Sequence, residues 1–136
     1  MRFSVLCLGL LVSAACGSDS AATPDAMIDA STAPSIAAMP TTPTINPGGV
    51  LLVNVTTQNF KIIPPAQASG VHPGEGHYHY YLDDAANYVA AWAASTGVRI
   101  PSSAAVGEHM IRFVLVHSDH IEVNPIVETT VTFMVQ

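Results

Sequence analysis

The sequence predicts an all-β domain, an antiparallel sandwich that begins near Gly48 and continues to Gln136. Three observations support this fold class. Apolar residues alternate with polar ones at a period of two, the apolar runs are short, and Gly, Pro, Asn and Asp separate them. A stretch of about 90 residues suits one domain with one core. This pattern is typical of sandwiches of the immunoglobulin type.

The alternation places four strands in order along the domain. They are expected at residues 51–62, 77–83, 109–117 and 130–135. The third is the strongest, because Ile111, Phe113 and Leu115 share one face. Weaker patterns add a first edge strand within residues 36–44 and a short strand at residues 98–100.

The segment at residues 84–95, DAANYVAAWAAS, departs from this alternation. Asp84 is a helix N-cap candidate, Tyr88 and Trp92 lie four residues apart, and Gly97 is a stop signal. Two readings fit, namely a short helix crossing between the sheets and an irregular loop in which Trp92 fills the core. In both readings Tyr88 and Trp92 are packing residues.

The N-terminus predicts export and lipid attachment. Arg2 precedes an apolar run at residues 3–12, and small residues at 13–15 precede Cys16. The run is about half of the roughly 20 residues that span a bilayer. We therefore expect a signal peptide at residues 1–15 that resembles the lipobox of bacterial lipoproteins, with Cys16 lipidated. The alternative is a soluble secreted protein with a chance cysteine at the cleavage position.

Residues 16–47 are expected to form a linker rich in Ala, Ser, Thr and Pro, followed by the sandwich at 48–136. Gly17 after Cys16 does not resemble the aspartate signal that retains lipoproteins at the inner membrane. We therefore expect an exported protein anchored in the cell envelope, at the outer membrane.

The charge balance excludes several partners. Without Arg2, three basic residues stand against ten acidic ones, which gives a net charge of −7. Nucleic acid and anionic lipid surfaces are therefore disfavoured, and membrane attachment rests on the acyl anchor alone. Cys7 leaves with the signal peptide and Cys16 carries lipid, so no disulfide is expected. The sequence does not identify a protein partner.

Six histidines fall within the predicted domain, and their spacing predicts a metal site. His77 and His79 point to the same face of a strand, about 6.6 Å apart. His117 and His120 flank a tight turn at the end of the third strand. If the second and third strands are antiparallel neighbours, these four rings converge. His109 would lie about 26 Å from His117, at the opposite end of the strand, and is expected to be structural.

We therefore predict His77, His79, His117 and His120 as metal ligands, with His72 as a spare ligand and Asp119 as a carboxylate that orients one ring. Imidazole-only ligation suits Cu(II) or Zn(II). The alternative is that these histidines cap backbone groups and pack against the neighbouring tyrosines, with no metal.

Two motifs resemble a known family. They are GHYHYYLD at residues 76–83 and GEHMIRFVL at residues 107–115, the second followed by Asp119-His120 and Pro125. This pattern resembles an uncharacterised family of immunoglobulin-like domains in exported bacterial lipoproteins. The resemblance covers roughly residues 49–136 and implies the sandwich fold, without an activity. The alanine-rich residues 84–96 replace a shorter polar link.

Two functions follow from these observations. The first is an envelope lipoprotein that holds Cu(II) or Zn(II) at its clustered histidines, and the alternative is a non-catalytic structural or protein-interaction module without a metal. An enzyme is not expected. The sequence contains no G-x-S-x-G or H-E-x-x-H motif, and the mature chain would have no cysteine nucleophile.

Overall fold

The computed structural model describes residues 32–136. The predicted signal peptide at 1–15, the lipidation site Cys16 and the first part of the predicted linker lie outside the described residues. The described chain forms a β-sandwich with one 3₁₀ turn, η1 (Pro65–Gln67), and no α-helix. The all-β fold class predicted from the period-two alternation is therefore confirmed.

Two sheets face each other across the core. One contains β1 (Ser35–Pro40), β3 (Val50–Gln58) and β7 (Ser95–Arg99), in that spatial order. The other contains, in spatial order, β2 (Thr44–Ile45), β9 (Glu128–Val135), β8 (Gly107–Val116), β5 (Glu75–Leu82) and β4 (Lys61–Ile62), with β6 (Val89–Ala91) also paired to β5. The long pairs are antiparallel, whereas the two-residue strands β2 and β4 pair in parallel. This connectivity is that of an immunoglobulin-type sandwich.

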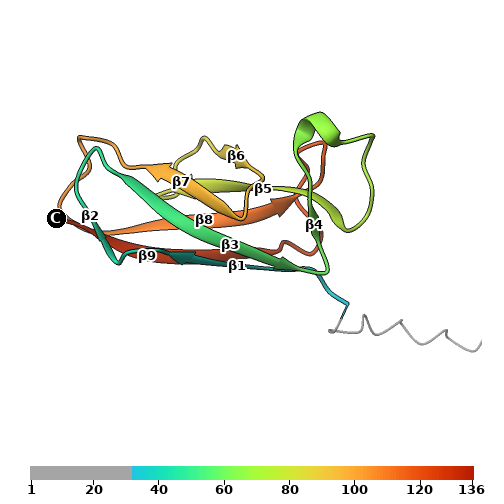
Figure 1. Ribbon diagram of the computed structural model, residues 1–136, viewed down its shortest axis with the longest axis horizontal. Helices are drawn as coiled ribbons and strands as arrows, with labels where there is room; N and C mark the ends of the chain where they lie inside the picture. The colour runs from blue at the N-terminus through green and yellow to red at the C-terminus, as the bar shows by residue number, and fades with distance from the viewer. Residues whose placement is uncertain (1–31) are drawn as a thin grey trace, which may run out of the picture.

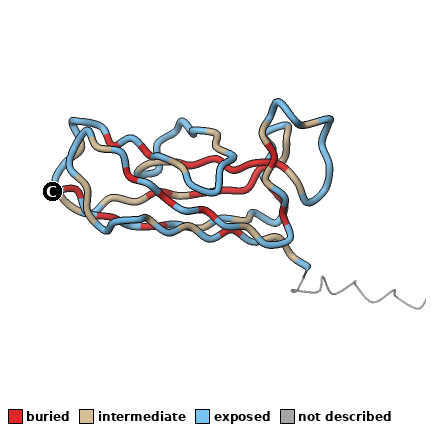
Figure 2. The backbone as a smooth tube through the Cα atoms, in the orientation of Figure 1, coloured by how far each residue is buried: buried red, intermediate tan, exposed pale blue. Residues whose placement is uncertain are grey.

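The core lies between the sheets and follows from the alternation. In β3 the odd-numbered residues Leu51, Val53 and Val55 are buried, and the residues between them face solvent. In β8, Ile111, Phe113 and Leu115 are completely buried. Figure 2 shows the buried residues running along the strands, while the connecting segments are mainly exposed.

The 84–95 segment contains no helix, contrary to the first reading of its sequence. The amide of Ala85 donates to the carbonyl of Leu82 at 3.0 Å, and Asp83 and Asp84 between them have φ values of 50° and 52°. These are features of a type I′ turn, whose left-handed backbone cannot begin a right-handed helix. The chain then returns along β5 as β6.

Trp92 does not fill the core, contrary to the second reading, because it is 45% exposed. The first predicted edge strand is present as β1, which pairs with β3 from Ser35↔Gln58 to Pro40↔Val53. The sandwich thus includes β1 and β2, which lie within the range 16–47 assigned to a linker. The sequence of β1 resembles a linker because its residues are mostly small and only Ile36 is buried.

The long strands run along the long axis of the molecule (Figure 1). β4, η1 and the segment before β5 lie at one end, and the C-terminus lies at the other. The start of β5 is paired with the end of β8, from His77↔Val116 to Leu82↔Ile111. The antiparallel neighbourhood on which the histidine prediction depended is therefore confirmed.

Candidate metal centre

The two histidines of β5 lie on the outer face of its sheet. Tyr78 and Tyr80 point into the core between the sheets, so His77 and His79 point the opposite way. Although they lie on the outer face, the two histidines are only 1% and 2% exposed. Burying a polar ring without a hydrogen-bond partner or a metal ion costs folding free energy. The site is therefore described by the groups that surround these two rings.

Valines of β8 form one side of this outer cluster. His77 pairs with Val116 and His79 with Val114 across the β5–β8 ladder, and both valines are completely buried. Directly paired residues share a face of the sheet. The histidines therefore lie in an apolar setting that disfavours positive charge.

Gly76 brings the next segment of the chain close to His77. A Cβ atom at Gly76 would overlap the carbonyl oxygen of Val116 and lie 2.9 Å from Cα of His117. Only glycine permits this approach of two backbones. The glycine that begins the GHYHYYLD motif thus allows the chain after β8 to pass directly beside the start of β5.

The turn after β8 carries the third histidine into the cluster. The amide of His120 donates to the carbonyl of His117 at 3.0 Å, and the amide of His117 donates to Ile121 at 2.8 Å. His120 has a φ of 65°, in the left-handed region that few residues other than glycine adopt. This conformation directs the chain back, so that the His120 ring meets the two rings of β5.

Three ring nitrogens converge at this point. Nδ1 of His120 lies 2.9 Å from Nε2 of His79 and 3.3 Å from Nε2 of His77. The three residues can each offer a nitrogen such that all three atoms lie within 4.8 Å of one another. The ring centroids are 4.7 to 5.2 Å apart. These three histidines could hold a metal ion.

The environment keeps the two buried rings neutral. Burial lowers the pKa of His79 to about 4, with further contributions from the neighbouring His77 and His120. Burial, followed by the effect of His120, also lowers the pKa of His77. A histidine must be neutral at the nitrogen that binds a metal, so a low pKa favours ligation at neutral pH.

The structure brings together three of the four predicted ligands and leaves His117 outside. Val116 shares the face of His77, so the next residue points to the opposite face. The His117 ring accordingly lies beside Phe60, with centroids 6.2 Å apart. Its Nδ1 is buried without a hydrogen-bond partner among the described residues.

The two auxiliary residues predicted for the site are also placed elsewhere. His72 is exposed, and its Nε2 lies 3.3 Å from Oγ of Ser69. Asp119 accepts a hydrogen bond from the amide of Ile121 at 3.2 Å, so its carboxylate stabilises the turn instead of orienting a ring. Its effect on the site is therefore indirect, through the turn that carries His120.

Sequence reasoning missed one residue that contacts the cluster. The Tyr88 ring is stacked on His79 with centroids 3.6 Å apart and planes within 5°. The reading of residues 84–95 as a helix or loop concealed this contact. Continuing the period-two pattern back from Ala90, which pairs with His79, would have placed Tyr88 on the same face.

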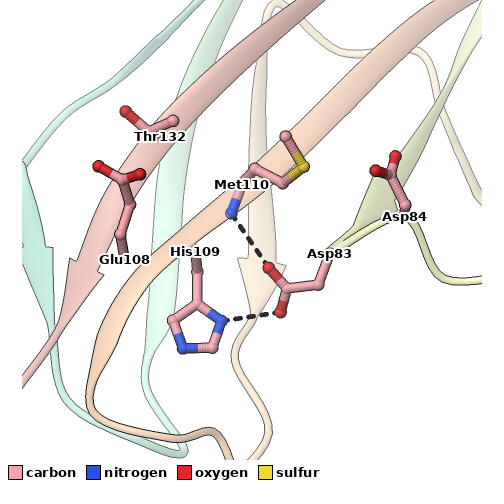
Figure 3. Close-up of a pocket in the computed structure, with 6 residues that line it drawn as sticks. All are labelled: Asp83, Asp84, Glu108, His109, Met110 and Thr132. Carbon is pink, nitrogen blue, oxygen red and sulfur yellow. Dashed lines mark hydrogen bonds and ion pairs between the residues drawn. The ribbon is translucent and has the colours of Figure 1, made fainter.

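His109 lies at the other end of β8, as expected. Its Nδ1 is 2.7 Å from Oδ2 of Asp83 and its Nε2 is 2.7 Å from the carbonyl oxygen of Ala105. Asp83 also accepts from the amide of Met110 at 3.0 Å, as Figure 3 shows. Both ring nitrogens face acceptors, an arrangement that favours the doubly protonated ring, and the Asp83 hydrogen bond raises the pKa of His109.

This second polar cluster borders an open cavity of about 310 Å³. Its lining residues are Asp83, Asp84, Glu108, His109, Met110 and Thr132. Because both nitrogens of His109 are engaged in hydrogen bonds, the ring has no free lone pair for a metal. His109 is therefore a structural residue that ties the end of β5 to β8.

No helix among residues 32–136 has the length and apolar character required to cross a bilayer. Comparisons of the chain with protein-family models, curated proteins and solved structures found no match. The case for its function therefore rests on the three-histidine geometry.

Proposed function

We propose that this protein is an exported, lipid-anchored protein whose sandwich domain holds a divalent transition metal at His77, His79 and His120. The observation that carries the proposal is the convergence of three ring nitrogens, at 2.9 and 3.3 Å from Nδ1 of His120. The low pKa of His79 adds support, because the ring offers a lone pair without first losing a proton.

Two of the three nitrogen separations suit the coordination of Cu(II) or Zn(II). Metal–nitrogen bonds of about 2.0–2.1 Å place cis nitrogens about 2.9 Å apart at a right angle and about 3.4 Å apart in a tetrahedron. The separations of 2.9 and 3.3 Å from Nδ1 of His120 lie within this range, and the remaining pair of nitrogens lies within 4.8 Å. Cu(II) should bind more tightly than Zn(II), since nitrogen sites generally follow that order.

Metal holding is favoured over catalysis by the burial of two of the three ligands, His77 and His79. Three protein ligands leave one position for water or another small ligand. His77 and His79 are nearly inaccessible, however, and the valines beside them leave little polar room for a substrate. We therefore assign the site to binding or buffering of the ion in the cell envelope.

Anchoring is proposed from residues 1–16, where the apolar segment ends in small residues and Cys16. Labelling of cells with a palmitate analogue tests it. We expect incorporation into the wild-type chain and none into Cys16→Ser. Incorporation that persists in Cys16→Ser would contradict lipidation at this residue.

A second candidate function is a structural or protein-interaction module without a metal. The observation that favours it is that the same nitrogens are close enough to hydrogen-bond to one another, with 2.9 Å between His79 and His120. Neutral rings linked in this way would satisfy buried polar groups without an ion.

Calorimetric titration distinguishes the two functions. The chain from residue 16 onward, carrying Cys16→Ser so that no thiol competes, is titrated with Cu(II) and with Zn(II). We expect one ion per chain, little change in His72→Ala, and loss of binding in His77→Gln/His79→Gln. Absence of binding to the unsubstituted histidine cluster would support the metal-free module.

A further inference from the structure

Tyr88 covers one ring of the three-histidine cluster, that of His79, while His120 is itself exposed. Tyr88 is 45% exposed, while the His79 ring beneath it is 2% exposed. The two rings are parallel within 5°, with centroids 3.6 Å apart. The Tyr88 ring therefore separates one face of a cluster ligand from solvent.

The β5–β6 pairing places Tyr88 over His79. His79 pairs with Ala90, and Tyr88, two residues earlier in an extended chain, emerges on the same face. The turn at Asp83 and Asp84 returns the chain to this position, and Asp83 is fixed to β8 by the His109 ring and the Met110 amide. The position of Tyr88 is thus set by regular pairing on one side and an anchored turn on the other.

Further ring contacts hold Tyr88 in place. Its ring lies 6.2 Å from that of Tyr81 in an edge-on arrangement and 6.1 Å from that of His120. The Arg112 guanidinium lies 4.3 Å from the centroid of the Tyr81 ring. Arg112 belongs to β8 and is paired with Tyr81, so it shares the outer face of the sheet. Tyr88 is therefore part of an aromatic row along β5.

Stacking excludes the Tyr88 hydroxyl as a ligand in this arrangement. A metal bound at Nε2 of His79 lies in the plane of that imidazole, and the Tyr88 ring is parallel to this plane. The tyrosine oxygen then lies in a plane stacked on that of the imidazole, with ring centroids 3.6 Å apart, and not in the plane of the ligand nitrogen, whereas a metal–oxygen bond is about 2.0–2.2 Å long. The ring face, and not the hydroxyl, is the functional group.

We propose that Tyr88 is a positioning residue that covers the metal site, holding the His79 ring toward His120 and slowing release of the bound ion. This inference rests on the proposed function and adds a fourth residue to the site. The stacking of two aromatic rings changes an equilibrium or rate constant by about two- to tenfold. Here the affected quantity is the rate at which the bound ion is released.

Release of Zn(II) to a chromophoric chelator tests the proposal. The chain from residue 16 onward with Cys16→Ser is loaded with one equivalent of Zn(II) and mixed with excess 4-(2-pyridylazo)resorcinol. We expect Tyr88→Ala to release zinc about two- to tenfold faster and Tyr88→Phe, which keeps the ring, to match the unsubstituted chain. Trp92→Ala is the matched control, since Trp92 is an equally exposed aromatic residue of the same segment.

The outcomes separate the two proposals. If zinc binds but Tyr88→Ala releases it at the unsubstituted rate, or Tyr88→Phe is as fast as Tyr88→Ala, the role of Tyr88 is overturned. If no zinc binds, the proposed metal function fails and the retention role fails with it.

A metal-free measurement tests the cover independently. His79 in the metal-free chain should react slowly with diethyl pyrocarbonate and faster in Tyr88→Ala, as located by mass spectrometry. Equal reactivity of His79 in the two chains would overturn the cover, whatever the result with zinc.

Discussion

Nε2 of His79 lies 2.9 Å from Nδ1 of His120, although the two residues are 41 positions apart in the chain. One lies in the middle of β5 and the other in the turn that follows β8. The antiparallel β5–β8 pairing brings the elements together, Gly76 permits their close approach, and the left-handed backbone at His120 aims the ring. The last two of these causes each give a separate prediction.

His120→Gly should abolish metal binding without unfolding the domain. Glycine relieves a left-handed conformation that costs about 1–2 kcal/mol, which offsets the lost ring contacts. We expect the metal-free free energy of unfolding to change by no more than about 1 kcal/mol. Excess zinc should raise the melting temperature of the unsubstituted chain by roughly 10 °C or more and leave His120→Gly unchanged. An equal rise in both chains would show that His120 is not a ligand.

Gly76→Ala should destabilise the fold and disrupt the site together. The added Cβ meets the backbone of Val116 and His117, which cannot move without breaking the end of the β5–β8 ladder. Overpacking of this kind costs about 1–3 kcal/mol. Gly107→Ala is the control, because its φ of 141° is also unfavourable for alanine but its Cβ would have no atom within 4 Å. Urea unfolding that gives the same loss for both variants would contradict the close approach at Gly76.

The metal-free domain should lose stability in acid through His79. Its pKa is about 4 in the folded chain, against 6.5 for an ordinary histidine, so between these values the unfolded chain binds a proton that the folded chain does not. The contribution of His79 to the free energy of unfolding is therefore fully present above pH 6.5 and is lost as the pH decreases toward 4. Urea midpoints at pH 7.5, 6.0 and 5.0 measure this slope. The urea midpoint of His79→Gln should depend less on pH than that of the unsubstituted chain. The same dependence in both chains would mean that a group other than His79 takes up the proton.

The His109–Asp83 pair should act in the opposite direction. The pKa of His109 is raised, chiefly by the hydrogen bond to Asp83 and then by that to Ala105. Its contribution to stability is therefore fully present below pH 6.5 and is lost as the pH rises through the higher folded value. The stability difference between wild type and His109→Gln should be larger at pH 6 than at pH 9. A difference that does not vary with pH would mean that His109 is neutral in the fold.

Period-two alternation was sufficient to predict the sandwich and to place His77 and His79 on one face, because side-chain parity fixes which residues of a strand share a face. It does not determine which strands pair, so the β5–β8 neighbourhood was a condition of the metal-site prediction that the structure meets. The same rule, applied at Val116, excludes His117 from the face of His77. His117 is the last residue of the predicted third strand, and the turn after it does not bring its ring back to that face. The ring of His120 returns to the cluster only because its backbone is left-handed, which alternation does not predict.

The segment at residues 84–95 was misread for a related reason. Alanine spacing and a capping aspartate are local preferences, and they favoured a helix. Two consecutive left-handed residues, Asp83 and Asp84, prevent that helix, and the hydrogen bonds of Asp83 to His109 and Met110 hold the turn. Both partners are distant in sequence, so the local pattern contains no information about them.

The proposed function requires that three imidazoles bind one metal ion, and X-ray absorption at the zinc edge counts these imidazoles. The chain from residue 16 onward with Cys16→Ser is loaded with one equivalent of Zn(II) and desalted, alongside His117→Ala. We expect three imidazole nitrogens at about 2.0–2.1 Å and one further light ligand, with the same spectrum for both chains. No retained zinc, fewer than three imidazoles, or loss of one imidazole in His117→Ala would contradict it.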